Sequence, residues 1–321
     1  MEERQLAIHV EGLNKVYKLY DHNRDRLGDS LGLARKKRYR EHYALRNVDL
    51  DIYQGECVGI IGTNGSGKTT TFRLMLGLAR PAGGEGIILG DPIRRVWVNA
   101  KSRTGVTFGD STFVPTFTLN DEIAERKRFY TTFDEQWCRA QLQRFTLPLN
   151  QQIQEFSAGM LAECKTIMAM AHHPEPLILD EPTAGLDVIA RNEVLDLLRE
   201  YMEIPGRSML ISSHVATDLE NLCDDLYLID RGRIRMHETI DALHDEYAVL
   251  TLTDDQMSAA DPRYILVKQR TAGGWKAITD ERGFYEENLP GVGICGASID
   301  EIITLMSADP RTTTMQERTM Q

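Results

Sequence analysis

Long apolar runs are missing from this sequence, and so is an apolar leader. Nowhere do about 18 consecutive apolar residues occur, which is the length that a membrane-spanning helix needs. The first ten residues, MEERQLAIHV, carry two acidic side chains and lack the apolar centre of a signal peptide. From these two absences we expect a soluble chain that neither enters nor crosses a bilayer by itself.

Paired cysteines and excess positive charge are also lacking. No Cys-x-x-Cys pair occurs, and an odd number of cysteines fits a disulfide framework poorly, which favours a reducing cytoplasm. The formal net charge of -11 would repel a polyanion, so we expect no nucleic acid partner. One basic run, Arg35 to Arg40, is an exception; a solvated surface explains it better than contact with anionic headgroups or acidic loops. The cysteines are Cys57, Cys138, Cys164, Cys223 and Cys295.

The sequence has enough residues for one large domain and a smaller one. At roughly 150 residues per domain, 321 residues leave room for both, and 42% apolar and 26% charged residues are typical of a globular protein. Near the N-terminus, Leu6–Val10 and Val48–Ile52 alternate apolar with polar side chains, which predicts an antiparallel layer. The charged stretch between them, about residues 20–42, reads as a surface insertion.

Short continuous apolar runs predict a parallel sheet. Cys57–Ile61 fits a strand that is buried on both faces, and the residues from Lys68 onward follow helical spacing until Pro81. Two more strands, Leu177–Leu179 and Met209–Ser212, flank an amphipathic helix over Ile189–Met202. This alternation implies a doubly wound α/β core.

Two other regions have different patterns of apolar and polar residues. Residues 119–147 mix charged with apolar side chains without a strand signal, which predicts a helical subdomain over about residues 111–172. After about residue 239, alternating runs at Val249–Leu252, Tyr264–Val267 and Trp275–Ile278 are separated by turns. Ser298 and Glu301 have the spacing of a capping box for a last helix. We therefore predict a first domain over residues 1–240, a small α+β accessory domain over 241–309 and a disordered tail over 310–321.

A glycine-rich loop joins the first buried strand to its helix. Its residues match G-x-x-x-x-G-K-[ST] between a strand and a helix, where that motif binds phosphate. Glycines let backbone N–H groups turn toward phosphates, Lys68 supplies a charge to the β and γ oxygens, and the Thr69 hydroxyl would ligate Mg²⁺. A glycine-rich turn without function is the alternative. The predicted nucleotide contacts are Gly62, Thr63, Asn64, Gly65, Ser66, Gly67, Lys68, Thr69 and Thr70.

Two adjacent carboxylates end the strand at Leu177–Leu179. Ligands of such sheets bind at the carboxyl ends of strands. There Asp180 can hold a metal ion through its water, and Glu181 can polarise the water that attacks the γ-phosphate. Carboxylates that merely favour the N-terminus of a following helix would give the same pattern.

Three further motifs complete a pattern that resembles the ATP-binding cassette family. They are Ser157-Ala158-Gly159 at the start of a helix, Ala184-Gly185-Leu186-Asp187, and His214 after a strand. All stand in the family's order, and the resemblance covers roughly residues 5–240. It implies a P-loop NTPase fold of this family's type, with an antiparallel β subdomain and a helical subdomain. It also implies a catalytic role for His214 beside Lys68 and Glu181, and a nucleotide contact for Asp187.

Three features depart from the family or leave alternatives open. The segment Phe156–Met160 keeps only the serine and the second glycine of L-S-G-G-Q. Ser157 and Gly159 could still cap the γ-phosphate of ATP held by a partner subunit. The alternative is that Ser157 is only the N-cap of its helix. The family's glutamine is missing, and Asp110 is its best substitute as a ligand of Mg²⁺ or its water, although a carboxylate cannot donate as an amide does. Tyr17 resembles the aromatic residue that stacks on adenine, and Tyr43 competes for that role.

The resemblance implies a transport ATPase that uses ATP and Mg²⁺. Such cassettes work as pairs, so we expect a dimer with itself or with a sibling subunit, bound to a separate membrane permease. We expect it in the cytoplasm, peripheral on the inner face of the cell membrane. The motifs look most like bacterial exporters of peptides, lipids or glycans. The alternative is an ATP-gated regulatory or scaffold protein with weak hydrolysis; a small GTPase has no support because no Asn-Lys-x-Asp motif occurs.

Overall fold

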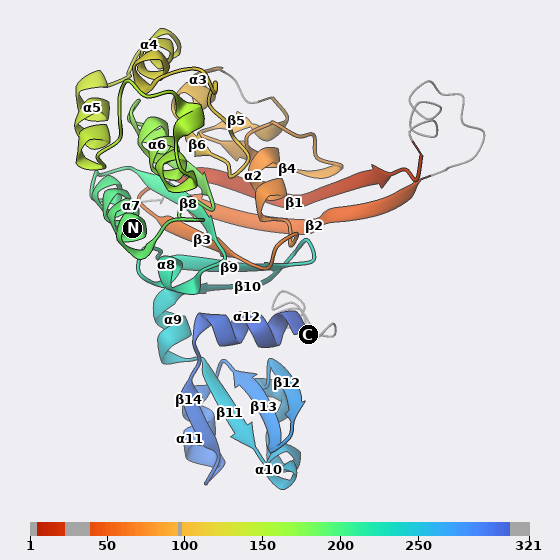
Figure 1. Ribbon diagram of the computed structural model, residues 1–321. Coiled ribbons are helices and arrows are strands. Elements are labelled where there is room, and N and C mark those ends of the chain that lie inside the picture. Colours follow the sequence, from red (N-terminus) through yellow and green to blue (C-terminus); the bar gives the residue numbers. More distant parts are fainter. Residues whose placement is uncertain (1–4, 23–38, 96–97, 309–321) are drawn as a thin grey trace.

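A six-stranded sheet forms the centre of the computed structural model, which describes residues 5–22, 39–95 and 98–308 (Figure 1). Its strand order is β10-β9-β3-β8-β7-β6. Neighbouring strands are parallel except for β10 and β9, which are antiparallel. The strands are β3 (Cys57–Ile61), β6 (Gly105–Thr107), β7 (Pro176–Asp180), β8 (Ser208–Ser213), β9 (Asp225–Asp230) and β10 (Arg233–Thr239).

Burial on both faces explains why these strands are continuous apolar runs. Every residue of β3, β7 and β8 is buried, as strands at the middle of a covered parallel sheet require. Because β8 lies between β3 and β7, the carboxyl ends of the three strands meet at one edge. The predicted α/β core is confirmed, and that edge is where its ligands are expected.

An antiparallel sheet of order β2-β1-β4-β5 covers one side (Figure 1). Its strands are β1 (Leu6–Leu19), β2 (Arg40–Tyr53), β4 (Gly83–Ile88) and β5 (Asp91–Pro92). Strand β2 already begins at Arg40, so the last residues of the predicted insertion over about residues 20–42 belong to this ladder. The β1–β2 ladder continues to Leu19 opposite Arg40, since backbone pairing does not need an apolar face. Residues 23–38, with most of the basic run, lie outside the described residues.

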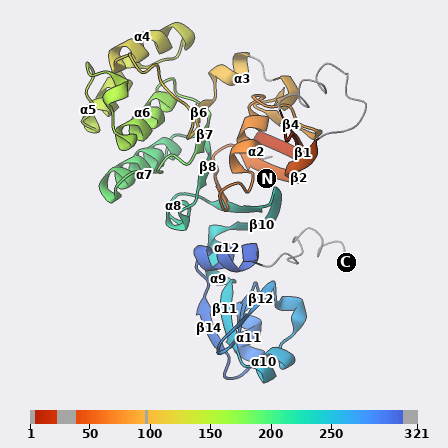
Figure 2. The same cartoon turned by 45° about the vertical axis from the view of Figure 1, so that its right-hand side comes forward.

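Helices lie on both faces of the central sheet (Figure 2). Helix α2 (Lys68–Met75) packs between the two sheets. It stops earlier than Pro81 because Gly77, with φ 66°, turns the chain and donates its N–H to the Leu74 carbonyl. On the other face lie α4 (Leu119–Phe129), α5 (Glu135–Arg144), α6 (Ala158–Met170), α7 (Val188–Met202) and α8 (Ala216–Glu220), whose buried apolar side chains belong to one core cluster. The short helix α3 (Val98–Ser102) leads into β6, and 3₁₀ turns lie at Ile93–Arg95 and Ile153–Glu155.

A third sheet, of order β12-β13-β11-β14, lies beyond β10 (Figure 1). The alternating run at Tyr264–Val267 is not a strand over its length, because Pro262–Tyr264 forms a 3₁₀ turn capped by Asp261 and the ladder begins only at Val267. The predicted capping box before the last helix is confirmed by the hydrogen bond from the Glu301 N–H to the Ser298 hydroxyl. The elements are α9 (Ile240–Asp245), β11 (Ala248–Leu252), α10 (Asp254–Ala259), β12 (Val267–Thr271), β13 (Gly274–Thr279), α11 (Arg282–Asn288), β14 (Gly293–Gly296) and α12 (Ile299–Ala308).

Helix α12 connects this third sheet to the rest of the chain. It packs on β12 and β13 on one side and on α8 on the other. Ile302 of α12 and Leu219 of α8 belong to one apolar core cluster, so the core is continuous across residue 240. The domain boundaries stay predictions, and the tail over 310–321 lies outside the described residues.

Over residues 5–22, 39–95 and 98–308, every helix is too short or too polar to cross a membrane.

Candidate functional site

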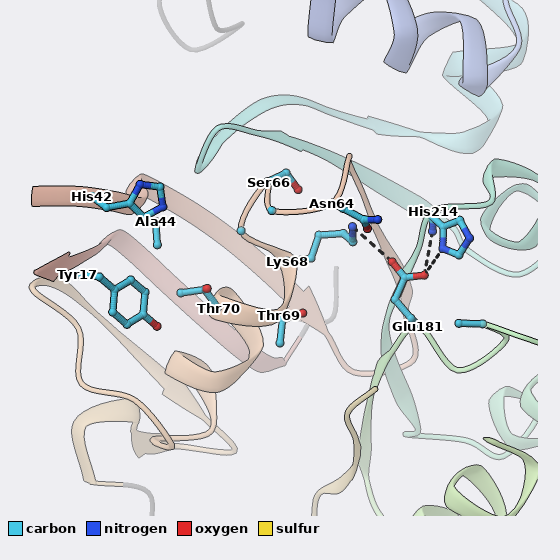
Figure 3. A pocket seen from close by; sticks show the side chains of 13 residues that line it. Tyr17, His42, Ala44, Asn64, Ser66, Lys68, Thr69, Thr70, Glu181 and His214 are labelled. Carbon is cyan, nitrogen blue, oxygen red and sulfur yellow. Dashed lines mark hydrogen bonds and ion pairs between the residues drawn. The ribbon is translucent and has the colours of Figure 1, made fainter. Parts of the chain in front are cut away.

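A cleft of about 480 Å³ opens at the carboxyl edge of the central sheet (Figure 3). Strands β1 and β2 form one end of it, and the residues that follow β7 and β8 form the other. Most of the predicted nucleotide contacts therefore converge on one space. Its lining consists of Tyr17, His42, Ala44, Asn64, Gly65, Ser66, Gly67, Lys68, Thr69, Thr70, Glu181, Ala184 and His214.

The glycine loop between β3 and α2 forms the floor of the cleft. Gly62 has no room for a side chain, because a Cβ there would lie 2.2 Å from the Ile229 carbonyl oxygen. Gly65 and Gly67 have φ values of 80° and 123°, which residues with side chains rarely adopt. Since α2 begins at Lys68, its free N–H groups point toward the loop and suit a phosphate.

Lys68 puts a positive charge inside this loop. Only 6% of its side chain is exposed, and its ammonium group donates to the Gly62 carbonyl at 2.7 Å and lies 3.4 Å from Glu181 Oε1. The Ser66 hydroxyl is buried beside it without a hydrogen-bond partner among the described residues. Buried polar groups are normally paired, so a buried cation and an unpaired hydroxyl in one loop fit an anionic ligand.

Oxygen ligands for a metal ion lie next to the loop. The Thr69 hydroxyl donates to Asp180 Oδ2 at 2.7 Å, and the Ser212 hydroxyl donates to Asp180 Oδ1 at 2.7 Å. In the part of the chain that the structure describes, no three His, Cys, Asp or Glu side chains gather to hold a metal by themselves. Mg²⁺ suits such a site, because it prefers oxygen, keeps several waters and completes its shell with substrate phosphates.

Glu181 directly follows the end of β7 in a strained conformation. Its φ is 54°, and its N–H is held by the Ser212 carbonyl and hydroxyl, each at 3.1 Å. The carboxylate Oε2 accepts from the His214 backbone N–H at 3.2 Å and also contacts the imidazole Nδ1 (Figure 3). Left-handed backbone at a residue with a side chain is costly and concentrates at functional sites. Glu181 is thus fixed between Lys68 and His214.

The far end of the cleft is aromatic. Tyr17 of β1 and His42 of β2 are directly opposite each other in the antiparallel ladder, so both side chains point to the same face. Tyr43 lies one residue further along β2 and points to the opposite face, which removes it from the lining. Of the two tyrosines that the sequence left open, the structure brings Tyr17 to the cleft. It also adds His42 and Ala44, for which no motif gave a signal.

Asp110 is not in the lining. Its carboxylate is paired with the Arg73 guanidinium, which lowers the pKa of Asp110, and 69% of its side chain is exposed. The Lys165 ammonium binds the neighbouring Gly109 carbonyl at 3.0 Å. A metal-binding role of Asp110 stays a prediction, and in this structure its partner is a cation of α2.

Ser157, Gly159 and Asp187 are also away from the cleft of their own chain. The Ser157 hydroxyl accepts from the Met160 N–H at 3.1 Å and caps α6. Asp187 caps α7 by accepting from the N–H groups of Ile189 and Ala190 at 2.9 and 3.0 Å. The side chains of Ser157 and Asp187 are exposed, so they have local capping roles and remain accessible to another molecule.

A buried carboxylate that the sequence analysis missed joins the loop after Glu181 to helices α7 and α8. Asp218 of α8 is 1% exposed; its Oδ2 accepts from the Thr183 hydroxyl at 2.7 Å and its Oδ1 accepts from Arg191 Nε at 2.6 Å. Thr183 stands two residues after Glu181, and Arg191 lies in the first turns of α7, four residues after Asp187. The chain spacing of these three residues, 183, 191 and 218, carries no recognisable pattern.

Replacing Asp218 by alanine should destabilise the protein by about 3 kcal/mol, because it leaves the Arg191 guanidinium and the Thr183 hydroxyl without their buried partner. Urea unfolding measures this free energy. Asp196→Ala is the matched control, since Asp196 pairs with Arg199 on an exposed helix face and should contribute less than about 1 kcal/mol. If Asp218→Ala and Asp196→Ala lowered the free energy of unfolding equally, the buried network would have no special role in stability.

Comparison with known proteins identifies relatives of this arrangement. A family model described as ABC transporter matches residues 45–184. The Nod factor export ATP-binding protein I of Cupriavidus metallidurans is 32% identical over 216 residues, which cover 64% of this chain and 71% of that protein. The match to the family model includes the glycine loop and the paired carboxylates. The match to the relative covers most of that protein's length.

Solved structures share the fold. An ATP-binding subunit of an ABC transporter superposes with a TM-score of 0.60 at 23% identity, covering 74% of this chain and 92% of that one. An ATP-binding cassette solved as a dimer in a post-hydrolysis state with ADP and Pi superposes with a TM-score of 0.56 at 20% identity, covering 73% of this chain and 98% of that one. At these identities the likeness establishes the fold alone.

Proposed function

The chain belongs to the ATP-binding cassette family of ABC transporters, and from this premise we propose that it powers an exporter whose membrane-spanning part is a separate polypeptide. As a member of this family it binds and hydrolyses ATP. The observation that carries the proposal is the convergence of Lys68, Thr69, Asp180, Glu181 and His214 around one cleft.

In the proposed reaction, the chain holds the triphosphate and positions one water molecule. The loop N–H groups and the Lys68 ammonium bind the β and γ oxygens. Glu181 accepts a hydrogen bond from the attacking water molecule and takes up its proton. The water oxygen bonds to the γ-phosphorus while the bond from that phosphorus to the β-phosphate oxygen breaks, giving ADP and phosphate. His214 holds the Glu181 carboxylate in place. A bound Mg²⁺, held by Thr69 and Asp180 through oxygen or water, would neutralise phosphate charge.

A second cassette completes the site in this proposal. Ser157 and Gly159 can serve only a nucleotide on another subunit, because they are outside the cleft of their own chain. Beside Asp187, the side chains of Val188 and Ile189 are 74% and 73% exposed. Adjacent apolar side chains at such exposure fit a surface that a partner covers. The partner is a second copy of this chain or a sibling cassette.

A separate surface suits the permease. A cavity of about 230 Å³ lies between the end of α2, α3, α4 and α6, with Leu76, Leu78 and Tyr130 among its lining residues. Leu78 is 62% exposed, and Lys101 and Arg126 add positive charge to the lining. We propose that a short amphipathic segment of the permease with acidic residues docks there and holds the chain, in the cytoplasm, on the inner face of the membrane.

The direction of transport follows the relatives. Their name describes export, and we extend that direction to this chain with a peptide, lipid or glycan as cargo. Residues 241–309 would form an accessory part of the same subunit.

Copurification tests the transport role. The tagged full-length chain, expressed in its native host and extracted in mild detergent, should retain a protein with several membrane spans. Leu78→Asp should release that protein while the ATPase rate of the purified chain stays within about twofold, because Leu78 is outside the catalytic cleft. Ile204→Asp, an exposed apolar site elsewhere (44%), is the matched control and should retain it. A soluble partner together with negligible turnover would instead support the regulatory or scaffold alternative.

A further inference from the structure

The aromatic end of the cleft contains a residue to which neither the motifs nor the family match assigns a role. His42 faces Tyr17 directly across the β1–β2 ladder, and Ala44 follows on the same face of β2 (Figure 3). The small side chain of Ala44 leaves space between this aromatic pair and the glycine loop. A flat group that enters the cleft beyond the phosphates therefore meets both rings.

The charges and shapes along the cleft fix how a nucleotide would lie. Lys68 and the loop amides are at one end with Glu181 and His214, so the phosphates belong there (Figure 3). The base is the flat, aromatic part of the molecule, and it is at the opposite end from the γ-phosphate. Tyr17 and His42 are the aromatic rings that line that opposite end. Aromatic rings stack on one another with a gain beyond simple burial.

We propose that His42 is a base-contacting residue of this ATPase, which stacks on the purine from β2 while Tyr17 contacts it from β1. The inference rests on the nucleotide site described above and adds a determinant of specificity to it. His42 makes the cleft prefer a nucleotide over a bare triphosphate chain. The imidazole side chain is exposed and accessible in the described structure, so the base can reach it without rearrangement of the strand.

The register of β2 supplies a matched control. Tyr43 is the next residue, is aromatic and is 42% exposed, yet it points to the other face of the sheet, where the Arg46 guanidinium lies 4.6 Å from its ring centroid. Removal of this ring disturbs the same strand and the same kind of exposed aromatic surface. It does not touch the cleft.

Equilibrium binding of ATP and of inorganic tripolyphosphate to the full-length chain tests the proposal. His42→Ala should weaken ATP binding about tenfold and leave tripolyphosphate binding unchanged, because tripolyphosphate has no base. His42→Phe should restore most of the ATP affinity through stacking. Tyr43→Ala should bind both ligands as the parent does.

Two results would overturn the role of His42. One is unchanged ATP affinity in His42→Ala; the other is an equal loss of ATP and tripolyphosphate, which would mean a general effect on the loop. Failure of His42→Phe to recover affinity would equally reject stacking. Lys68→Met distinguishes a wrong role for His42 from a wrong nucleotide site, because it should weaken the binding of both ATP and tripolyphosphate. If it weakens the binding of neither, the nucleotide site itself is misplaced, whatever the result for His42.

Discussion

Glu181→Gln is expected to lower the rate of ATP hydrolysis by about 10³-fold while ATP still binds. The amide keeps the shape of the side chain but is a far weaker proton acceptor, so water near the γ-phosphate is no longer polarised. The contacts of this residue to His214 and Lys68 support its proposed role as the base in the cleft. Since ATP then persists, the variant should accumulate as a nucleotide-bound dimer. Steady-state phosphate release and size-exclusion chromatography with MgATP measure the two effects.

Glu193→Gln is the control for this prediction. Glu193 is an exposed carboxylate of α7 outside the cleft. The Glu193→Gln variant should therefore hydrolyse ATP at the parent rate. If Glu181→Gln also turned over ATP at the parent rate, another group would have to activate the water, and the assignment of Glu181 would be wrong.

Lys68→Met should weaken ATP binding by about 100-fold, which also removes hydrolysis at ordinary ATP concentrations. Methionine keeps much of the length and the apolar stem of a side chain that is only 6% exposed, so the loop can fold. What it removes is the ammonium group that we propose faces the phosphate oxygens. A fluorescent ATP analogue or calorimetry gives the affinity directly.

Lys127→Met provides the comparison for loss of a lysine at the surface. Lys127 is 51% exposed and pairs with Glu135 on the helical side of the molecule. Its replacement should leave ATP affinity within about twofold. Parent-like ATP affinity in Lys68→Met would place the triphosphate somewhere other than the glycine loop.

Local patterns of the sequence were sufficient to predict the parallel core and the position of the glycine loop at its edge. Strands such as Leu177–Leu179 are recognisable because burial on both faces demands an unbroken apolar run. The glycine loop is recognisable because its backbone conformation demands glycine, as the φ of 123° at Gly67 illustrates. In both cases the physical requirement acts on neighbouring residues, so it leaves a contiguous trace.

The features that were missed depend on contacts between distant parts of the chain. His42 reaches the cleft only through its register with Tyr17, 25 positions away, and one residue of slippage would put Tyr43 there instead. Asp218 is explained by its partners Thr183, in the loop after Glu181, and Arg191 of α7. The strands β1 and β2 run beyond their alternating segments because backbone pairing continues where neither face needs to be apolar. None of these relationships alters the local spacing of residue types.

The Asp110 segment shows a related limit. The sequence assigns it by position to the place of a missing glutamine, and the structure adds that the carboxylate contacts Arg73. Motif position specifies the backbone location of a residue. Motif position does not specify which nearby cationic side chain will pair with that residue.

A high-resolution structure of the Glu181→Gln variant with MgATP tests the central claim most directly. The account predicts a triphosphate in the loop Gly62–Thr69, with Lys68 on its β and γ oxygens, the metal beside Thr69 and Asp180, and residue 181 facing the γ-phosphate. A nucleotide bound outside this cleft, or a triphosphate that none of these four side chains approaches, would contradict it.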